Sequence, residues 1–309
     1  MVMSKQILFM KNLLVLVSIP LFGSTPIATT ALSDLRNLLH SENEWVKVHV
    51  AEFLLWENQC VDEVREVFLK EEQQFGHTPK YRIGIWRVLA QAAADEKDQQ
   101  YWEDKIITAY NDIEGEDRLH AIETLAKLKV YVARDVPTNM ESSFRLYSLW
   151  NQALGSSREQ RKVKDLLVSD LVDDKLTELE IHVTSYILRY IGPLSGREYH
   201  QIISWMQGKD IKMALRSNLL ATLVISCPKN QSSDALETLK KEMISLREHK
   251  EAVPHIMMAL AQKGGVSDSG VISELYAAMR DVKSTDYNSD LHATAAYMVL
   301  KAANNVVVD

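Results

Sequence analysis

The chain has 309 residues, of which 46 % are hydrophobic and 25 % are charged, and its net charge is −7. This composition is ordinary for a folded protein and excludes a disordered chain, while an acidic chain without basic clusters is a poor partner for nucleic acid. Because the chain holds only 11 Gly and 7 Pro, its composition favours helices over strands and turns.

The first 31 residues differ from the rest of the chain. Their only charges are Lys5 and Lys11, residues 13–22 are apolar, and small residues follow. This pattern is typical of a secretory signal peptide, with cleavage near Ala31, and its apolar core is too short to span a membrane. We therefore expect a signal peptide over 1–31, a single domain over 32–309 and a secreted or periplasmic protein without a stable membrane span. The alternative is an N-terminal anchor or a frayed first helix.

A helical repeat with a period of about 36 residues runs through the remaining chain. Equivalent positions, aligned on His49, are Gly84, His120, Arg145, His182, Arg216, Pro254 and His292. Each is preceded by a large apolar residue, and the fifth residue after each is uncharged. These columns predict one amphipathic helix per unit, which we call the inner helix.

A second amphipathic stretch precedes each inner helix. The expected stretches are 32–40, 61–73, 97–111, 158–173, 197–208, 233–248 and 269–283, with a degenerate one over 129–135. Residues 135–139 read as a loop that replaces most of the helix before Arg145. An irregular unit of this kind indicates either a harmless deletion or a break related to binding.

Two runs carry a resemblance to a known family. The run VKVHVAEFLL from Val46 returns as DRLHAIETLA from Asp117. With the period, these runs resemble HEAT-type repeats, including the phycobilisome-lyase-like HEAT proteins, over residues 32–306. Basic Lys47, Arg82 and Arg118 match the family pattern, and later units depart from it. The resemblance implies an all-α fold, an α-solenoid of about eight antiparallel helical hairpins in a HEAT-like superhelix, whose second helices line a concave, rarely catalytic binding surface.

The inner helices carry the candidate contact residues. Positions zero, three and seven residues after the reference share one helix face, which is polar in the first five units. The expected contact residues are His49, Glu52, Trp56, Arg87, His120, Glu123, Lys127, Arg145 and Arg189. In the last three units this face is apolar, with Leu219, Met257 and Ala295 among its members. It is either an exposed interface or a stripe buried within the protein.

Some of these residues admit a second interpretation. His49 with Glu52, and His120 with Glu123, have the spacing of metal ligands or an acid/base pair, but recurrence of His at one repeat position favours packing. We expect no catalytic residue, metal or cofactor. Trp56 either packs on the next unit or stacks on a sugar ring or peptide. Cys60 and Cys227 are expected to be free thiols because they lie several units apart.

The sequence thus predicts an exported, non-catalytic binding or scaffold protein that recognises a protein or peptide through the concave face. The alternative is a glycan-binding or glycan-processing α/α-toroid, which would differ by closing into a ring. A weaker third alternative is an accessory lyase or chaperone for a chromophore, against which the export signal argues. The partner, the oligomeric state and open or closed geometry stay open at this point.

Overall fold

The protein is described by a computed structural model that covers residues 26–132, 141–229, 231–282 and 285–305. These residues form 15 α-helices and one short 3₁₀ turn, η1 (Val266–Asp268), and among them there is no strand. The all-α prediction is confirmed. Residues 1–25 of the predicted signal segment and the predicted loop 135–139 lie outside the described residues. Residues 26–31, the end of the predicted signal segment, are described.

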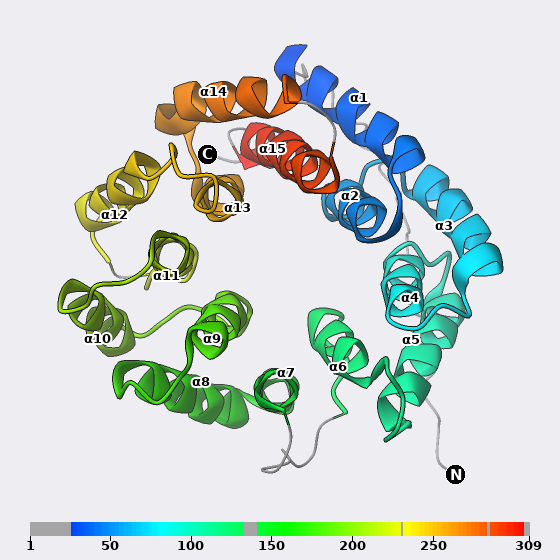
Figure 1. Cartoon of the computed structure of the whole chain (residues 1–309), viewed down its shortest axis with the longest axis horizontal. Helices are drawn as coiled ribbons and strands as arrows, with labels where there is room; N and C mark the ends of the chain where they lie inside the picture. The colour runs from blue at the N-terminus through cyan, green and yellow to red at the C-terminus, as the bar shows by residue number, and fades with distance from the viewer. Residues whose placement is uncertain (1–25, 133–140, 230, 283–284, 306–309) are drawn as a thin grey trace, which may run out of the picture.

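The helices form two concentric layers that together make a ring (Figure 1). The outer layer consists of α1 (Pro26–Ser41), α3 (Val61–Phe75), α5 (Glu96–Asn111), α8 (Ser157–Val172), α10 (Gly196–Gln207), α12 (Ser233–Ser245) and α14 (Ser269–Arg280). The inner layer consists of α2 (Glu44–Trp56), α4 (Tyr81–Gln91), α6 (Arg118–Lys127), α7 (Ser142–Ala153), α9 (Glu178–Tyr190), α11 (Met213–Ile225), α13 (Val253–Lys263) and α15 (Asp286–Asn305). Each aligned reference position lies in a helix of the inner layer.

The inner layer closes on itself. Each inner helix packs against the next from α2 to α15, and α15 then packs against α2 and α1. The seam is fixed by polar contacts: the Asp34 carboxylate lies 2.9 Å from His292 Nε2, accepts a 2.7 Å hydrogen bond from the Tyr276 hydroxyl and pairs with Arg280 at 2.8 Å. The open superhelix implied by the resemblance is therefore not what the chain forms, because its last inner helix fills the gap beside the first.

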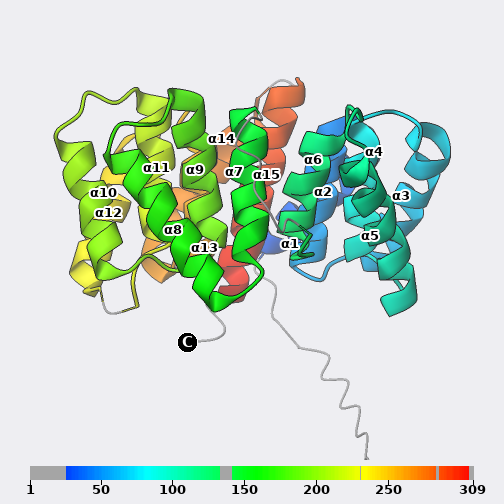
Figure 2. The same ribbon diagram turned by 90° about the horizontal axis from the view of Figure 1, so that it is seen from below.

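The inner helices are parallel to one another and lie along the axis of the ring (Figure 1 and Figure 2). Glu52 pairs with Arg87, and four residues later on both helices Trp56 bonds to Gln91, so α2 and α4 are parallel. Figure 2 shows that the helices stand side by side, so the ring is one helix tall. It follows that the N-terminal ends of the inner helices lie at one face of the ring and their C-terminal ends lie at the opposite face.

Local sequence explains the two layers. Outer helices are amphipathic and bury one stripe, as α10 does with Tyr199, Ile202 and Met206, whereas inner helices such as α11 are apolar on most sides because neighbours flank them. Several helices begin at a polar cap: Thr177 and Ser195 each form a capping box with the Glu three residues later.

Three predictions concern helix α1, the short unit before α7 and the apolar face of the last three inner helices. Helix α1 begins at Pro26 and buries Ala28 and Ala31, so the predicted cleavage site lies within this helix. No outer helix precedes α7 among the described residues, as the short unit predicted. Of the two alternatives for the apolar face, burial is correct, because Leu219, Met257 and Ala295 are at most 1 % exposed.

Candidate functional site

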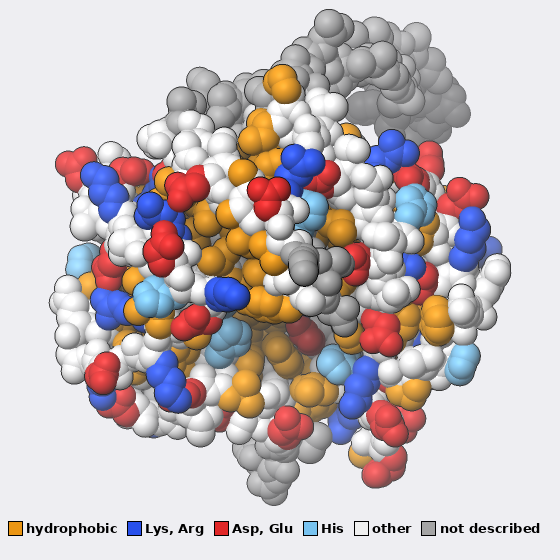
Figure 3. Space-filling model, turned by 45° about the horizontal axis from the view of Figure 1, so that its top comes forward, with side chains coloured by type: hydrophobic (Ala, Val, Ile, Leu, Met, Phe, Trp, Pro, Cys, Tyr) orange, Lys and Arg blue, Asp and Glu red, His pale blue; other side chains and the backbone are white. Residues whose placement is uncertain are grey.

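A cavity of about 320 Å³ lies at the centre of the ring. Its lining comes from six inner helices and comprises His49, Glu52, Phe53, Trp56, Gln91, Lys127, Leu128, Tyr186, Tyr190, Pro254, Met258, Asp290 and Thr294. Figure 3 shows hydrophobic side chains around a hollow in the middle of the molecule, with charged side chains around them. A larger hollow of about 570 Å³ between α8 and α10 is shallow and open, so the central cavity is the better candidate site.

Aromatic rings line the cavity from opposite sides. Trp56 on α2 is 41 % exposed and lies edge to face with Phe53, which stacks on Tyr297 of α15 at 4.7 Å between centroids. Helices α2 and α9 lie on opposite sides of the ring (Figure 1). On α9, Tyr190 is 43 % exposed, and its exposed surface belongs to the cavity wall. A flat, partly apolar ligand would therefore meet aromatic surface on both sides.

The α9 rings are held in place by a third ring behind them. Trp150 of α7 is buried and lies 5.8 Å from the Tyr186 centroid and 4.9 Å from that of Tyr190. The two tyrosine rings lie 5.0 Å apart. Burial raises the pKa of both phenols, so they stay neutral hydrogen-bonding groups at physiological pH.

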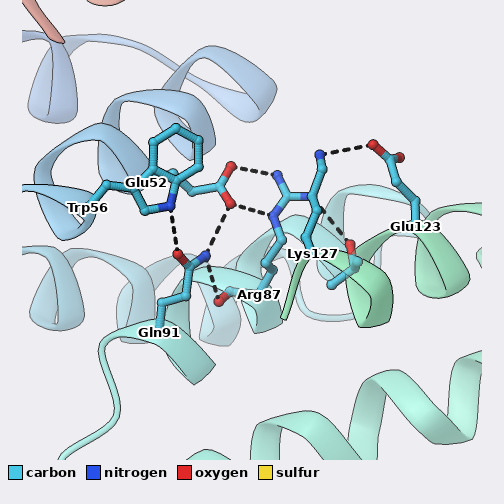
Figure 4. A network of polar contacts seen from close by, with 7 residues as sticks. Glu52, Trp56, Arg87, Gln91, Glu123 and Lys127 are labelled. Atoms are coloured by element: carbon cyan, nitrogen blue, oxygen red, sulfur yellow. Dashed lines mark hydrogen bonds and ion pairs between the residues drawn. The ribbon is translucent and has the colours of Figure 1, made fainter. Parts of the chain in front are cut away.

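A network of paired charges supports the opposite wall (Figure 4). Glu52 and Arg87 are buried, with side chains 5 % and 3 % exposed. Arg87 Nη2 donates to Glu52 Oε2 at 2.8 Å, and Arg87 Nε lies 2.8 Å from Oε1 without hydrogen-bond geometry. Arg87 Nη1 donates to the Thr124 hydroxyl at 3.2 Å. Burial alone would raise the pKa of Glu52, but the charges of Arg87, Lys127 and His49 together with the Arg87 hydrogen bond outweigh it, so the pKa is lowered.

The network continues to the cavity on both sides. Gln91 donates to Glu52 at 3.1 Å and accepts a 3.1 Å hydrogen bond from Trp56 Nε1, so the indole of this cavity-lining residue is held in place at its nitrogen. Lys127 pairs with Glu123 at 2.9 Å and lies 5.6 Å from the centre of the Tyr186 ring. Burial works to raise the pKa of Glu123, but Lys127, Arg87 and His120 together more than offset it, so the pKa is lowered.

The histidines of the first units have structural partners. His49 Nδ1 lies 2.7 Å from Asp290 Oδ1 across the ring seam. His120 lies 5.5 Å from the Trp45 ring, and burial lowers its pKa. Both glutamates of the His-x-x-Glu pairs are ion-paired with cations, Glu52 with Arg87 and Glu123 with Lys127. The described residues also hold no group of three His, Cys, Asp or Glu side chains suited to a metal ion.

The expected contact residues do not all lie together. His49, Glu52, Trp56 and Lys127 line the cavity, and Arg87 and Glu123 lie directly behind them. His120 packs on Trp45, and Arg145 lies 3.9 Å from Glu180, so these two do not line the cavity. Arg189 crosses to α11, where its guanidinium donates to the Asn218 carbonyl at 2.8 Å and to the Thr222 hydroxyl at 3.0 Å.

Several cavity residues were missed because inner helices are rotated differently in each unit. Tyr186 and Tyr190 each lie one residue after a position of the predicted face, and one residue turns a helix by about 100°. Asp290 and Thr294 lie two residues before and after the reference residue, His292. The i, i+4 spacing of the two tyrosines was the one signal that could have indicated them.

Cys60 and Cys227 are free thiols, as expected. Among the described helices none is long and apolar enough to cross a bilayer.

Comparisons with protein-family models, with curated proteins and with solved structures found no match.

Proposed function

We propose that this protein binds a carbohydrate in the central cavity of the ring, without cleaving it. The observation that carries the proposal is the pair of aromatic surfaces, Trp56 on one wall and Tyr186 with Tyr190 on the other, that face one cavity of about 320 Å³. Sugar rings have apolar faces that stack on aromatic rings and hydroxyl edges that take hydrogen bonds. Gln91, Thr294 and Asp290 supply polar groups at the same cavity.

The closed ring favours this proposal over recognition of a folded protein. Because α15 packs against α2, the described helices present no open concave groove for a protein surface. The cavity volume is at the small end of ligand sites, which fits one or two sugar units or one extended segment better than a macromolecular interface. An extended peptide is therefore the competing ligand, and the experiment below separates it from a saccharide.

Charge pairing argues against glycoside cleavage at this site. Cleavage needs one carboxyl group that keeps its proton near neutral pH and a second that is ionised. Glu52 and Glu123 have lowered pKa values, and Asp290 lies 2.7 Å from a histidine ring. The described carboxyl groups at and behind the cavity therefore favour binding over acid/base catalysis.

We also propose that the chain is related to HEAT-type repeat proteins and is exported. The hairpin succession and the period of about 36 residues support the relation. The apolar segment 13–22 supports export, and helix α1 suggests that cleavage occurs before Pro26, since a cut near Ala31 would remove two buried alanines.

Binding can be tested with the protein from Pro26 onward and a panel of oligosaccharides and extended peptides, by calorimetry. Trp56→Ala should weaken binding of the preferred saccharide at least about tenfold, since stacking on an aromatic ring contributes on the order of 1 to 3 kcal/mol. Trp205→Ala is the matched control, because Trp205 lies on outer helix α10 and bonds to Asp174. Equal loss in both variants, or binding of peptides but no saccharide, would refute the proposal.

A further inference from the structure

The side of the ring formed by α9, α11 and α13, which we call the α9–α13 wall of the ring, contains a cluster of cationic and basic groups, Arg189, His182 and His255. His182 and His255 come from α9 and α13, and their ring centroids lie 5.6 Å apart. Arg189 reaches across α11, which lies between those two helices, and bonds to Asn218 there. His182 Nδ1 lies 3.1 Å from the amide nitrogen of the same asparagine. The three side chains therefore lie close together beside α11: Arg189 and His182 share Asn218, and His255 lies next to His182.

The cluster residues do not line the cavity themselves, but each of the two histidines lies beside residues that do. His182, Tyr186 and Tyr190 follow one another at intervals of four along α9 and so share one helix face, of which the two tyrosines line the cavity. His255 lies next to Pro254, which also lines the cavity. A ligand held between Trp56 and Tyr190 can therefore extend a substituent towards the cluster.

Arg189 has no acidic partner among the described residues. Its Nε donates to the Thr222 hydroxyl, and its Nη2 donates to the carbonyl and the side-chain oxygen of Asn218. No hydrogen bond of Nη1 to a described residue is found. Burial lowers the pKa of Arg189 to about 10 and the pKa of His255 to about 3, so the guanidinium is charged and the His255 ring neutral at pH 7.

The sequence of this wall explains the missing counter-ion. Helices α11 and α13 contain no Asp or Glu along their length, and α9 has its acids only in the first turn. Those acids are engaged elsewhere, Glu178 with Lys212 at 2.8 Å and Glu180 in the capping box with Thr177. Arg189 is only partly buried, but a partly desolvated cation without a counter-ion is still unfavourable, and a bound anion would supply one.

We propose that Arg189, His182 and His255 form an anion-binding subsite, so that the carbohydrate held in the cavity carries a carboxylate or a sulfate group. This inference rests on the proposed carbohydrate function. The guanidinium supplies a charge-assisted hydrogen bond to the anion, and the imidazoles supply donors beside it. The paired charges of the opposite wall leave that side neutral, so a single acidic group on the ligand has one preferred orientation.

The test compares three disaccharides that differ in one group: a neutral glucose disaccharide, the same disaccharide ending in glucuronic acid, and its sulfate ester. Calorimetry on the full chain from Pro26 should show that one of the acidic forms binds at least about tenfold more tightly than the neutral form. The better of the two acidic forms identifies whether carboxylate or sulfate is the natural group. Equal affinity for all three would overturn the subsite and leave the carbohydrate proposal standing.

Variants assign the effect to the cluster. Arg189→Gln should remove the preference for the acidic form while keeping affinity for the neutral form within about threefold, and Arg189→Lys should retain part of the preference. Arg158→Gln, an exposed arginine on outer helix α8, is the matched control and should keep the preference. If Arg189→Gln does not fold, the double variant His182→Asn with His255→Gln takes its place and should reduce the preference. A preference unchanged in the folded variant would overturn the assignment.

Failure of the two proposals can be told apart with sulfate alone. If no disaccharide binds, the carbohydrate proposal fails, and the anion subsite is then judged by NMR of the histidine rings during sulfate titration. The His182 and His255 signals should shift in the wild-type protein and stay unchanged in Arg189→Gln. Absence of a shift in the wild-type protein would overturn the subsite as well.

Discussion

On the side of the ring built by α2, α4 and α6, buried Arg87 has a carboxylate beside it. In the wall of the ring built by α9, α11 and α13, Arg189 has only neutral partners among the described residues. Both walls come from the same repeat and use the same helix layer. The difference shows that the repeat determines where side chains can lie, while individual residues decide which wall is complete without a ligand. A buried cation that is paired with a carboxylate of the same protein needs no ligand, whereas a cation without a counter-ion leaves a position for an anionic ligand.

The largest expected effect is in the paired wall. Glu52→Ala leaves Arg87 buried without its counter-charge and should lower the free energy of unfolding by about 3 to 5 kcal/mol. Urea unfolding followed by circular dichroism measures it. Glu66→Ala is the matched control, because the Glu66–Lys70 pair is more than 70 % exposed on both sides and should contribute under about 1 kcal/mol. Similar losses in the two variants would show that the wall does not depend on its buried pair.

Acidification should affect the two walls in different pH windows. The pKa of His255 is lowered from 6.5 to about 3 by burial and by Arg189 and His182, so the unfolded chain binds its proton first and stability falls as pH drops below about 6.5. The pKa of Glu52 is lowered from 4.5, so its contribution is present above about 4.5 and is lost as pH falls through its folded value.

Unfolding measured from pH 7 to pH 3 separates these contributions. His255→Gln should reduce the loss between pH 6.5 and 5 by about 1 to 2 kcal/mol. Glu52→Gln should leave that window unchanged and flatten the curve below about pH 4.5. A single window affected equally by both variants would contradict the assignment of different charge environments to the two walls.

The smallest expected effect is in the unpaired wall. Arg189→Met removes a charge that has no counter-ion, and its former partners keep other contacts: Thr222 still donates to the Ser185 carbonyl at 3.0 Å, and Asn218 to the His182 carbonyl at 3.2 Å. We expect the free energy of unfolding to change by less than about 1 kcal/mol, in the same urea assay. A loss as large as that of Glu52→Ala would mean that Arg189 is a structural residue and would remove the contrast.

Much of the fold followed from the period of apolar residues. The apolar columns align because each inner helix packs against neighbouring helices in the same way and buries apolar residues at equivalent positions. Helix positions were therefore predictable within a few residues. Closure was not, because it depends on the small rotation between successive units, and that rotation adds up to a full turn only in three dimensions. The same rotations explain why Trp56 was expected at the site while Tyr190 was missed, although both line one cavity.

The seam at Asp34 and His292 also has a consequence for how the chain folds. These residues are 258 positions apart, whereas contacts between neighbouring units join residues about 35 apart, as Trp56 and Gln91 do. Contacts near in sequence form early because their loop-closure entropy is small, so the hairpins should assemble first and the seam last. An open array needs polar end units to stay soluble, but in this chain the apolar sides of α1 and α2 are covered by α15. Formation of the seam therefore covers the apolar sides of the first and the last unit in one step. Until the seam has formed, a partly folded chain would be prone to aggregate.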